Sequence, residues 1–230
     1  FLILYFVSPT KYKNYVLLIG SIIFYIIGAW EHPHYVLLLG IAILLNYIIG
    51  KKLEKNKNKK ILIVGIIYNL IWLIFFKYSD FIISIISNIS DVYIEPLNLL
   101  LPIGISFYTF QICSYIIDVY KQKVPAEKSV LDLGVYICMF PQLIAGPIVT
   151  YSSVARQLHQ RKHTLALAES GLKEFVIGLG LKVLLANQIA NLWNNAAAIG
   201  FESISTPLAW MAIFAFTFQI YFDFYGYSSG

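Results

Sequence analysis

The residues best suited to chemistry in this sequence are polar side chains that interrupt apolar runs. Gln111, Gln142, Gln219 and Asp223 each lie inside such a run or at its end. An ionisable residue within a membrane span costs roughly 2.5–3.5 kcal/mol on insertion scales, which makes Asp223 a functional hypothesis. The three glutamines fit either hydrogen bonds between helices or the wall of a tunnel for a thioester or an acyl chain. The sequence leaves both interpretations open.

Histidine would be the natural general base for a reaction at neutral pH, because its pKa lies near that pH. None of the four histidines falls in a predicted membrane span. His32 and His34 lie in a short turn without a third ligand, so we predict no metal site there. His159 and His163 are four residues apart beside Arg161, and we interpret them as part of a solvated basic face. The sequence therefore offers no catalytic histidine in its apolar core.

The composition is that of an integral membrane protein. Hydrophobic residues make up 59% of the 230 residues, charged residues 13%, and the mean hydropathy is +0.72, whereas soluble domains carry about 25% charged residues. The net charge of +5 does not indicate nucleic-acid binding, because the lysines lie in loops between apolar runs, where they set membrane orientation. Cys113 and Cys138 lie within apolar runs and are expected to be small buried side chains.

Apolar runs of this length predict an all-α polytopic bundle of transmembrane helices. Asn46 and Asn69, inside two of the runs, are interpreted as helix-packing groups. Lys77–Pro96 is mixed in character, and its core Asp80–Ser90, with apolar residues at helical spacing, is predicted to be an interfacial helix. The predicted spans, besides a partial one at the start of the chain, are Tyr15–Trp30, Tyr35–Gly50, Ile61–Phe76, Leu97–Tyr120, Leu165–Asn191 and Pro207–Tyr227.

The basic segments predict one segment that enters the membrane and returns. By the positive-inside rule Lys51–Lys60, Lys121–Asp132 and Ser152–Thr164 are cytoplasmic. The apolar run Leu133–Tyr151 therefore has basic segments on both sides, and a single span cannot begin and end on the same face. We predict a re-entrant segment that turns near Pro141–Pro147, with its non-helical backbone buried in protein or facing a wet cavity.

The whole of residues 1–230 is expected to form a single transmembrane domain. The chain begins at Phe1 within an apolar run and ends at Gly230 just after a polar and aromatic cluster. We therefore expect the sequence to be truncated at both ends.

Three blocks carry a family resemblance. LPIGISFYTFQ with SYIIDVYK, then FPQLIAGPIVTY, then QIYFDFYGYS together resemble the membrane-bound O-acyltransferases, and most closely their alginate O-acetyltransferase type. The resemblance covers the N-terminal and central part of such a domain. It implies that the catalytic histidine, found in the family within a Trp-His-Gly segment, lies beyond Gly230. The residues that it implies as substrate-channel candidates are Gln111, Gln142, Pro147, Gln219, Asp223 and Tyr227.

The resemblance also implies a function. The chain would be part of a multi-pass enzyme of the inner or plasma membrane that moves an acyl group, expected to be acetyl, to hydroxyls of an extracytoplasmic polysaccharide or cell-wall glycan. The donor would be cytoplasmic acetyl-CoA, no cofactor would be bound, and a partner acetyltransferase could receive the group. Two alternatives stay open: a D-alanyl-transfer protein for teichoic acid, and a transporter or flippase, which also uses broken helices.

Overall fold

The computed structural model describes residues 1–90, 92–143, 148–161, 164–200 and 202–229, and every regular element in those ranges is a helix. The chain forms two compact units, Phe1–Arg161 and Lys162–Gly230. Each is described by itself. The expectation of one transmembrane domain over the whole chain stays a prediction.

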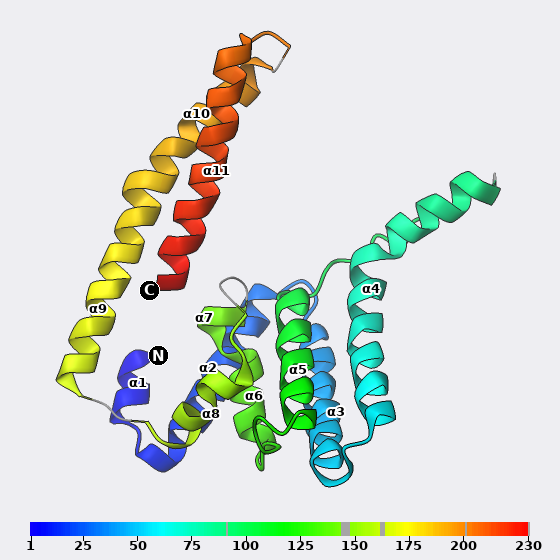
Figure 1. Ribbon diagram of the computed structural model, residues 1–230, viewed down its shortest axis with the longest axis vertical. Coiled ribbons are helices and arrows are strands. Elements are labelled where there is room, and N and C mark those ends of the chain that lie inside the picture. The colour runs from blue at the N-terminus through cyan, green and yellow to red at the C-terminus, as the bar shows by residue number, and fades with distance from the viewer. Residues whose placement is uncertain (91, 144–147, 162–163, 201, 230) are drawn as a thin grey trace. The chain divides into compact units, whose positions relative to one another are not determined.

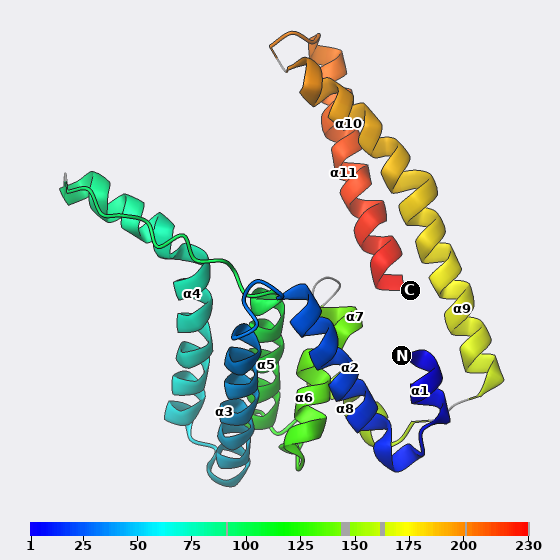
Figure 2. The ribbon, with the colours of Figure 1, turned by 180° about the vertical axis from the view of Figure 1, so that it is seen from behind.

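The first unit is a bundle built around the helices α3, α4 and α5. These three helices pack against one another, and α6 packs against α2 and α3 (Figures 1 and 2). The elements of this unit are α1 (Leu2–Val7), the 3₁₀ turn η1 (Thr10–Tyr12), α2 (Lys13–Gly28), α3 (Tyr35–Asn56), α4 (Lys59–Ser90), α5 (Ile105–Tyr120), α6 (Val130–Cys138), α7 (Phe140–Leu143) and α8 (Tyr151–His159).

The second unit is a helical hairpin. Its first arm runs through α9 (Leu165–Gly180), the π-helical stretch η2 (Leu181–Ala186) and α10 (Asn187–Ile199) without a break. Its second arm, α11 (Thr206–Ser229), packs against all three parts of the first arm, and Figure 1 shows the two arms side by side.

Four helices are long and apolar enough to cross a membrane by length and composition: Tyr35–Asn56, Lys59–Ser90, Leu165–Ile199 and Thr206–Ser228. Their outer faces carry exposed large apolar side chains such as Leu37, Val64 and Leu184, as expected where lipid is the surrounding solvent. The predicted class, an all-α polytopic membrane protein, is confirmed.

The helix boundaries differ from the predicted ones in the basic segment Lys51–Lys60. Helix α3 continues to Asn56 and α4 begins at Lys59, so most of this predicted loop is helical. Lys and Glu are good helix formers, and a solvated basic face does not require an irregular backbone. The predicted loop Leu192–Thr206 shortens in the same way, because α10 continues to Ile199.

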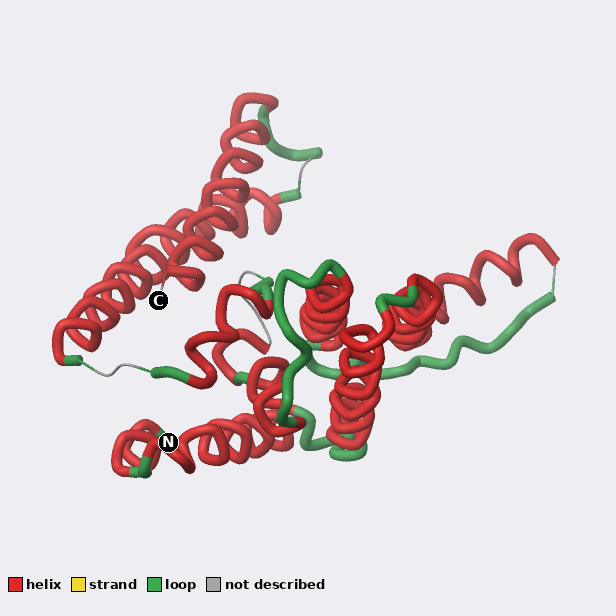
Figure 3. The backbone as a smooth tube through the Cα atoms, turned by 60° about the horizontal axis from the view of Figure 1, so that its bottom comes forward, coloured by secondary structure: helices red, strands yellow, loops and turns green. Residues whose placement is uncertain are grey.

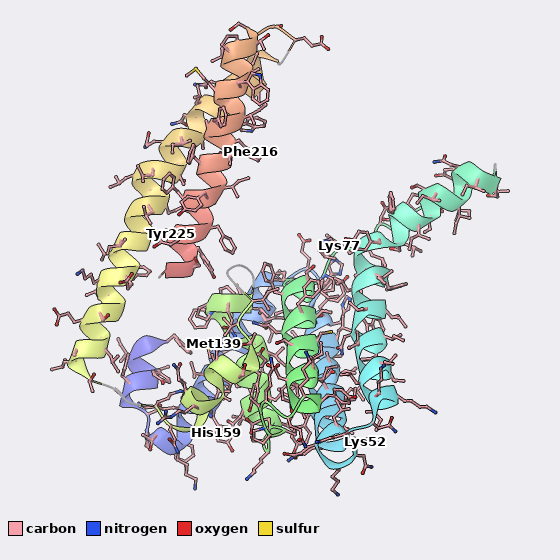
Figure 4. The ribbon with its side chains drawn as sticks, viewed as in Figure 1. Lys52, Lys77, Met139, His159, Phe216 and Tyr225 are labelled. Atoms are coloured by element: carbon pink, nitrogen blue, oxygen red, sulfur yellow. The ribbon has the colours of Figure 1, made fainter. Side chains whose placement is uncertain are left out.

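The predicted interfacial helix is not a separate element. Helix α4 runs on through Lys77 to Ser90, and Figure 1 shows it changing direction along its length. Figure 4 labels Lys77 at the bend. The apolar spacing continues at the helical period through Lys77, so no feature of this spacing marks a helix boundary there.

Helix α5 begins eight residues later than predicted, at Ile105 rather than at Leu97. Gly104, the residue before it, has φ +71, and a Cβ atom there would lie 2.4 Å from the backbone oxygen of Leu143. Glycine is therefore required by both the left-handed backbone and the close approach. The residues before it form a long loop, which is green in Figure 3.

Asn46 of α3 and Asn69 of α4, which the sequence suggested as helix-packing groups, are hydrogen-bonded to each other. Each side-chain NH₂ donates to the other residue's Oδ1 at 2.9 Å, and each also donates to a backbone oxygen of its own helix. Both residues are buried. The pair therefore fixes the rotation of α3 against α4, since either helix turned about its axis would leave two carboxamides unpaired.

We expect Asn69→Leu to lower the free energy of unfolding by about 1–2 kcal/mol, because it leaves the carboxamide of Asn46 buried without its partner. The double variant N46L/N69L should be less destabilised than the sum of the two single variants. Thermal unfolding of the full-length protein in detergent would measure this, with Asn56→Leu at an exposed position as the control. Additive effects would contradict a direct interaction.

Candidate functional site

The helix break in the predicted re-entrant segment lies at Met139. Helix α6 ends at Cys138, and Met139 has a non-helical backbone (φ −52, ψ 114). The short helix α7 follows, and residues 148–150 before α8 are not helical. The break comes two residues before Pro141, the predicted start of the turn. Residues 144–147, which include the channel candidate Pro147, lie outside the described residues.

The two ends of this segment meet, as a re-entrant segment requires. Asp132 lies in the first turn of α6 and Leu158 lies near the end of α8. The side-chain NH₂ of Asn14, on α2, donates to Asp132 Oδ1 at 2.5 Å and to the backbone oxygen of Leu158 at 3.2 Å. The start of α6 and the end of α8 therefore lie close together, joined through Asn14.

A buried carboxylate closes the segment at the same end. Glu127, in the linker between α5 and α6, has a side chain only 1% exposed. Its Oε1 accepts the backbone N–H groups of Lys128 at 2.6 Å and Ser129 at 3.2 Å. Its Oε2 accepts the hydroxyl of Tyr151 and lies 3.1 Å from His159 Nε2. One side chain therefore joins the linker to both ends of α8.

His159 is not simply part of a solvated basic face, as the sequence suggested. Its other ring nitrogen, Nδ1, lies 3.8 Å from Asp132 Oδ2, so the ring stands between two carboxylates. Figure 4 labels it at the end of α8. The sequence missed this role because the carboxylates come from the linker and from α6. His163 lies outside the described residues.

Glu127, Asp132 and His159 are also a group that could hold a metal ion, since one ligand atom from each lies within 4.8 Å of the others. Both oxygens of the Glu127 carboxylate already accept hydrogen bonds, from the Tyr151 hydroxyl and from two backbone N–H groups, so its burial needs no metal ion to explain it. We therefore assign the cluster a role in closing the segment. The sequence prediction of no metal is not tested by this geometry.

Gln142 and Gln111, two of the channel candidates, both lie beside Tyr136 of α6. The Gln142 side chain donates to the backbone oxygen of Tyr136 at 2.8 Å, a carbonyl left near the end of the broken helix. The Tyr136 hydroxyl donates to the backbone oxygens of Val149 at 2.8 Å and Gln111 at 3.4 Å. Gln111 Oε1 is buried and accepts no hydrogen bond within the described chain.

An apolar cavity of about 480 Å³ opens nearby between α1, α2 and α7. Carbon atoms form almost all of its wall, and Phe140, directly after the helix break, is part of it. Neither Gln111 nor Gln142 lines it. The two glutamines therefore belong to the packed interior around Tyr136 and not to the wall of this cavity.

The other described candidates lie on α11 in the second unit. Gln219, Asp223 and Tyr227 follow one another at intervals of four residues, which places them on one face of the helix. The Asp223 carboxylate pairs with the ammonium of Lys182 in η2. Gln219 Oε1 is buried without a partner in the described chain, and Tyr227 is half exposed. Lys182, a charge within a predicted span, is thus the partner of one of the channel candidates.

The pKa of Glu127 predicts how stability depends on pH. Burial raises this pKa, but the hydrogen bonds from Tyr151 and the backbone, with the charge of His159, outweigh burial and hold it below its ordinary value of 4.5. A lowered folded pKa contributes stability above the unfolded pKa, and that contribution is lost as pH falls through the folded value.

We expect Glu127→Gln to lower the free energy of unfolding at pH 7 by about 1.5–3 kcal/mol, because hydrogen bonds to a charged group are lost. The difference from wild type should shrink as pH falls below about 4.5. Unfolding of the full-length protein in detergent at several pH values would measure it, with exposed Glu95→Gln as the matched control. A difference that does not change with pH would contradict an ionised Glu127.

No protein-family model matches the chain. It is 38% identical to the probable alginate O-acetylase AlgI of Pseudomonas syringae pv. tomato and 36% identical to that of Pseudomonas aeruginosa, over 99% of the chain and 45% of each relative. It is 34% identical to the peptidoglycan O-acetyltransferase of Helicobacter pylori, over 81% of the chain and 41% of that protein.

The chain thus spans less than half the length of the curated relatives that it matches. Over that length the similarity is nearly continuous, and it includes all three blocks that carried the resemblance. These relatives confirm the resemblance to the membrane-bound O-acyltransferases of the alginate O-acetylase type, of which this membrane protein is a homologue.

Proposed function

We propose that the full-length protein is a membrane O-acyltransferase that transfers an acetyl group to hydroxyls of an extracytoplasmic polysaccharide or cell-wall glycan. The observation that carries this proposal is the similarity, over 99% of the chain, to proteins named alginate O-acetylase. A further relative is named peptidoglycan O-acetyltransferase. These names favour acetyl transfer over D-alanyl transfer to teichoic acid and over a transporter or flippase.

The interior of the first unit supports such an activity. A broken helix inside a membrane protein needs protein groups or water to satisfy its backbone, and here Gln142 supplies one such bond. Gln111, one helix away, keeps a carboxamide oxygen without a donor. A substrate hydroxyl or the amide N–H of a thioester donor would supply one.

The donor in this proposal is cytoplasmic acetyl-CoA, and the protein binds no cofactor of its own. The cytoplasmic side is that of Lys51–Lys60, where lysines gather at the ends of α3 and α4, and the membrane is the inner or plasma membrane. A partner acetyltransferase could receive the acetyl group before the glycan does.

The general base is proposed to be a histidine outside residues 1–230. Within the described residues, the His32 ring stacks on Tyr35 and the His34 ring meets Tyr35 edge-on, while His159 lies between two carboxylates. An Asp is a poor base for an alcohol at its usual pKa of about 4.

Residues 1–230 alone are therefore expected to insert into membranes but not to transfer acetyl groups. The intact gene and this fragment would be expressed in an acetylation-deficient host, and ester-linked acetate on the polysaccharide would be measured. The intact protein should restore the ester and the fragment should not. Restoration by the fragment would place the base within these residues.

Gln142→Leu in the full-length enzyme should lower acetyl transfer about 3- to 10-fold without lowering the amount of inserted protein. The reason is the loss of one hydrogen bond, worth about 0.5–1.5 kcal/mol, at the helix break. Gln157→Leu, at an exposed position of α8, is the control and should leave transfer unchanged. Equal transfer in the two variants would show that Gln142 does not position the site.

A further inference from the structure

Two charged residues of the second unit face each other inside its membrane-spanning hairpin. Lys182 precedes the end of α10, Ile199, by 17 residues, and Asp223 follows the start of α11, Thr206, by 17. At 1.5 Å per residue, both lie about 26 Å from the turn of the hairpin. With that turn at the outer surface, the pair falls inside a hydrocarbon core of about 30 Å, near its cytoplasmic boundary.

The helices are shaped to bring the two charges together. Lys182 lies in the π-helical stretch η2, and such stretches are frequent at functional sites. Gly226 follows Asp223 on α11, and a Cβ atom there would lie 2.6 Å from the backbone oxygen of Gly178 and 3.4 Å from the backbone nitrogen of Lys182. Only glycine allows this approach, which places η2 directly against α11.

The pair is not fully satisfied by the unit that contains it. An ammonium group has three N–H donors, and Asp223 is the one ion-pair partner that Lys182 has among the described residues. The side chains of Lys182 and Asp223 are 46% and 44% exposed, and lipid cannot accept a hydrogen bond. The remaining donors need an oxygen from water, from protein outside this unit or from a ligand.

We propose that Lys182 is a substrate-binding residue whose ammonium donates a hydrogen bond to the carbonyl oxygen of the acyl donor. This inference rests on the proposed function and concerns groups of the second unit alone. Asp223 fixes the ammonium and balances its charge, while the unpaired oxygen of Gln219, one turn away on α11, accepts an N–H or hydroxyl of a substrate.

The chemistry suits a fixed cation. When a hydroxyl of the acceptor attacks a thioester carbonyl, the new C–O bond forms and negative charge collects on the carbonyl oxygen. The hydroxyl proton passes to the general base, which is proposed to lie outside residues 1–230. The C–S bond then breaks, and the leaving thiolate takes this proton back from the protonated base and departs as the thiol. A preorganised donor at that oxygen typically contributes a factor of about 10²–10³ in rate.

A purely structural ion pair would behave differently when both partners are removed. Replacing a buried pair by apolar residues of similar volume is often neutral or stabilising, whereas removing one partner is costly. The double variant therefore separates a role in folding from a role in binding substrate.

The first experiment uses the full-length protein in its membrane with K182M, D223L and K182M/D223L, and K173M, which changes an exposed lysine of α9, as the control. The double variant should accumulate like wild type but transfer acetyl at least about 100-fold more slowly, and K182R should recover part of the activity. Transfer that returns together with protein amount in the double variant would overturn the proposal.

The second experiment reads access to position 182 without any acetylation assay. K182C is placed in a background of C113A and C138A and treated with aminoethyl methanethiosulfonate, which couples a short ammonium to the thiol. It should react, while L184C, at a 70% exposed lipid-facing position, should not.

The aminoethyl group should also restore part of the acetyl transfer, and the uncharged methyl reagent should not. Lack of reaction at K182C would overturn the proposal whatever the activity. If K182C reacts as expected but the wild-type protein forms no acetate ester, the proposed function would be refuted instead.

Discussion

The buried carboxylate of Glu127 is the contact on which the first unit depends. The helix is broken at Met139, so the segment from Val130 to His159 is not held together by the backbone hydrogen bonds of one continuous helix. The side chain of Glu127 connects it instead, through hydrogen bonds to the linker backbone, to Tyr151 at the start of α8 and to His159 at its end. A re-entrant segment in lipid needs such a closure, because any backbone group that it frees must find a partner within the protein.

The second unit meets the same constraint with different groups. Lys182 and Asp223 lie within apolar helices and form an ion pair across the hairpin. Gly226 lies beside this pair, and any larger side chain there would keep the two helices apart. In both units a local irregularity, a helix break or a π-helical stretch, lies next to a polar contact. Irregular backbone is costly in a membrane, so its coincidence with polar groups in both units points to sites and not to simple anchors.

The all-α membrane class and the interrupted segment could be predicted from the sequence, because long apolar runs and the residues that interrupt them are strong signals. Hydropathy identified the apolar helices, and the prolines and glycine of Pro141–Pro147 indicated an interruption of Leu133–Tyr151, where the helix breaks at Met139. The return of this segment to its own side of the membrane, which the lysines around it predict, stays a prediction. Helix ends were predicted poorly, since Lys51–Asn56 continues α3 while Gly104 delays α5. The pairings of His159 with Glu127 and of Lys182 with Asp223 could not be predicted, because nothing local to either residue specifies which distant charge it meets.

The hydrogen bonds also rank the channel candidates. The side-chain NH₂ of Gln142 donates to the backbone oxygen of Tyr136 near the helix break. Gln142 therefore stabilises the end of the broken helix, which makes it a positioning residue. Gln111 and Gln219 each keep a buried carboxamide oxygen with no donor in the described chain, a state that costs about 1–3 kcal/mol when nothing fills it. A folded protein tolerates such groups where a ligand or water completes them. Gln111 in the first unit and Gln219 in the second therefore differ from Gln142, because each keeps an acceptor that a group beyond the described chain could complete.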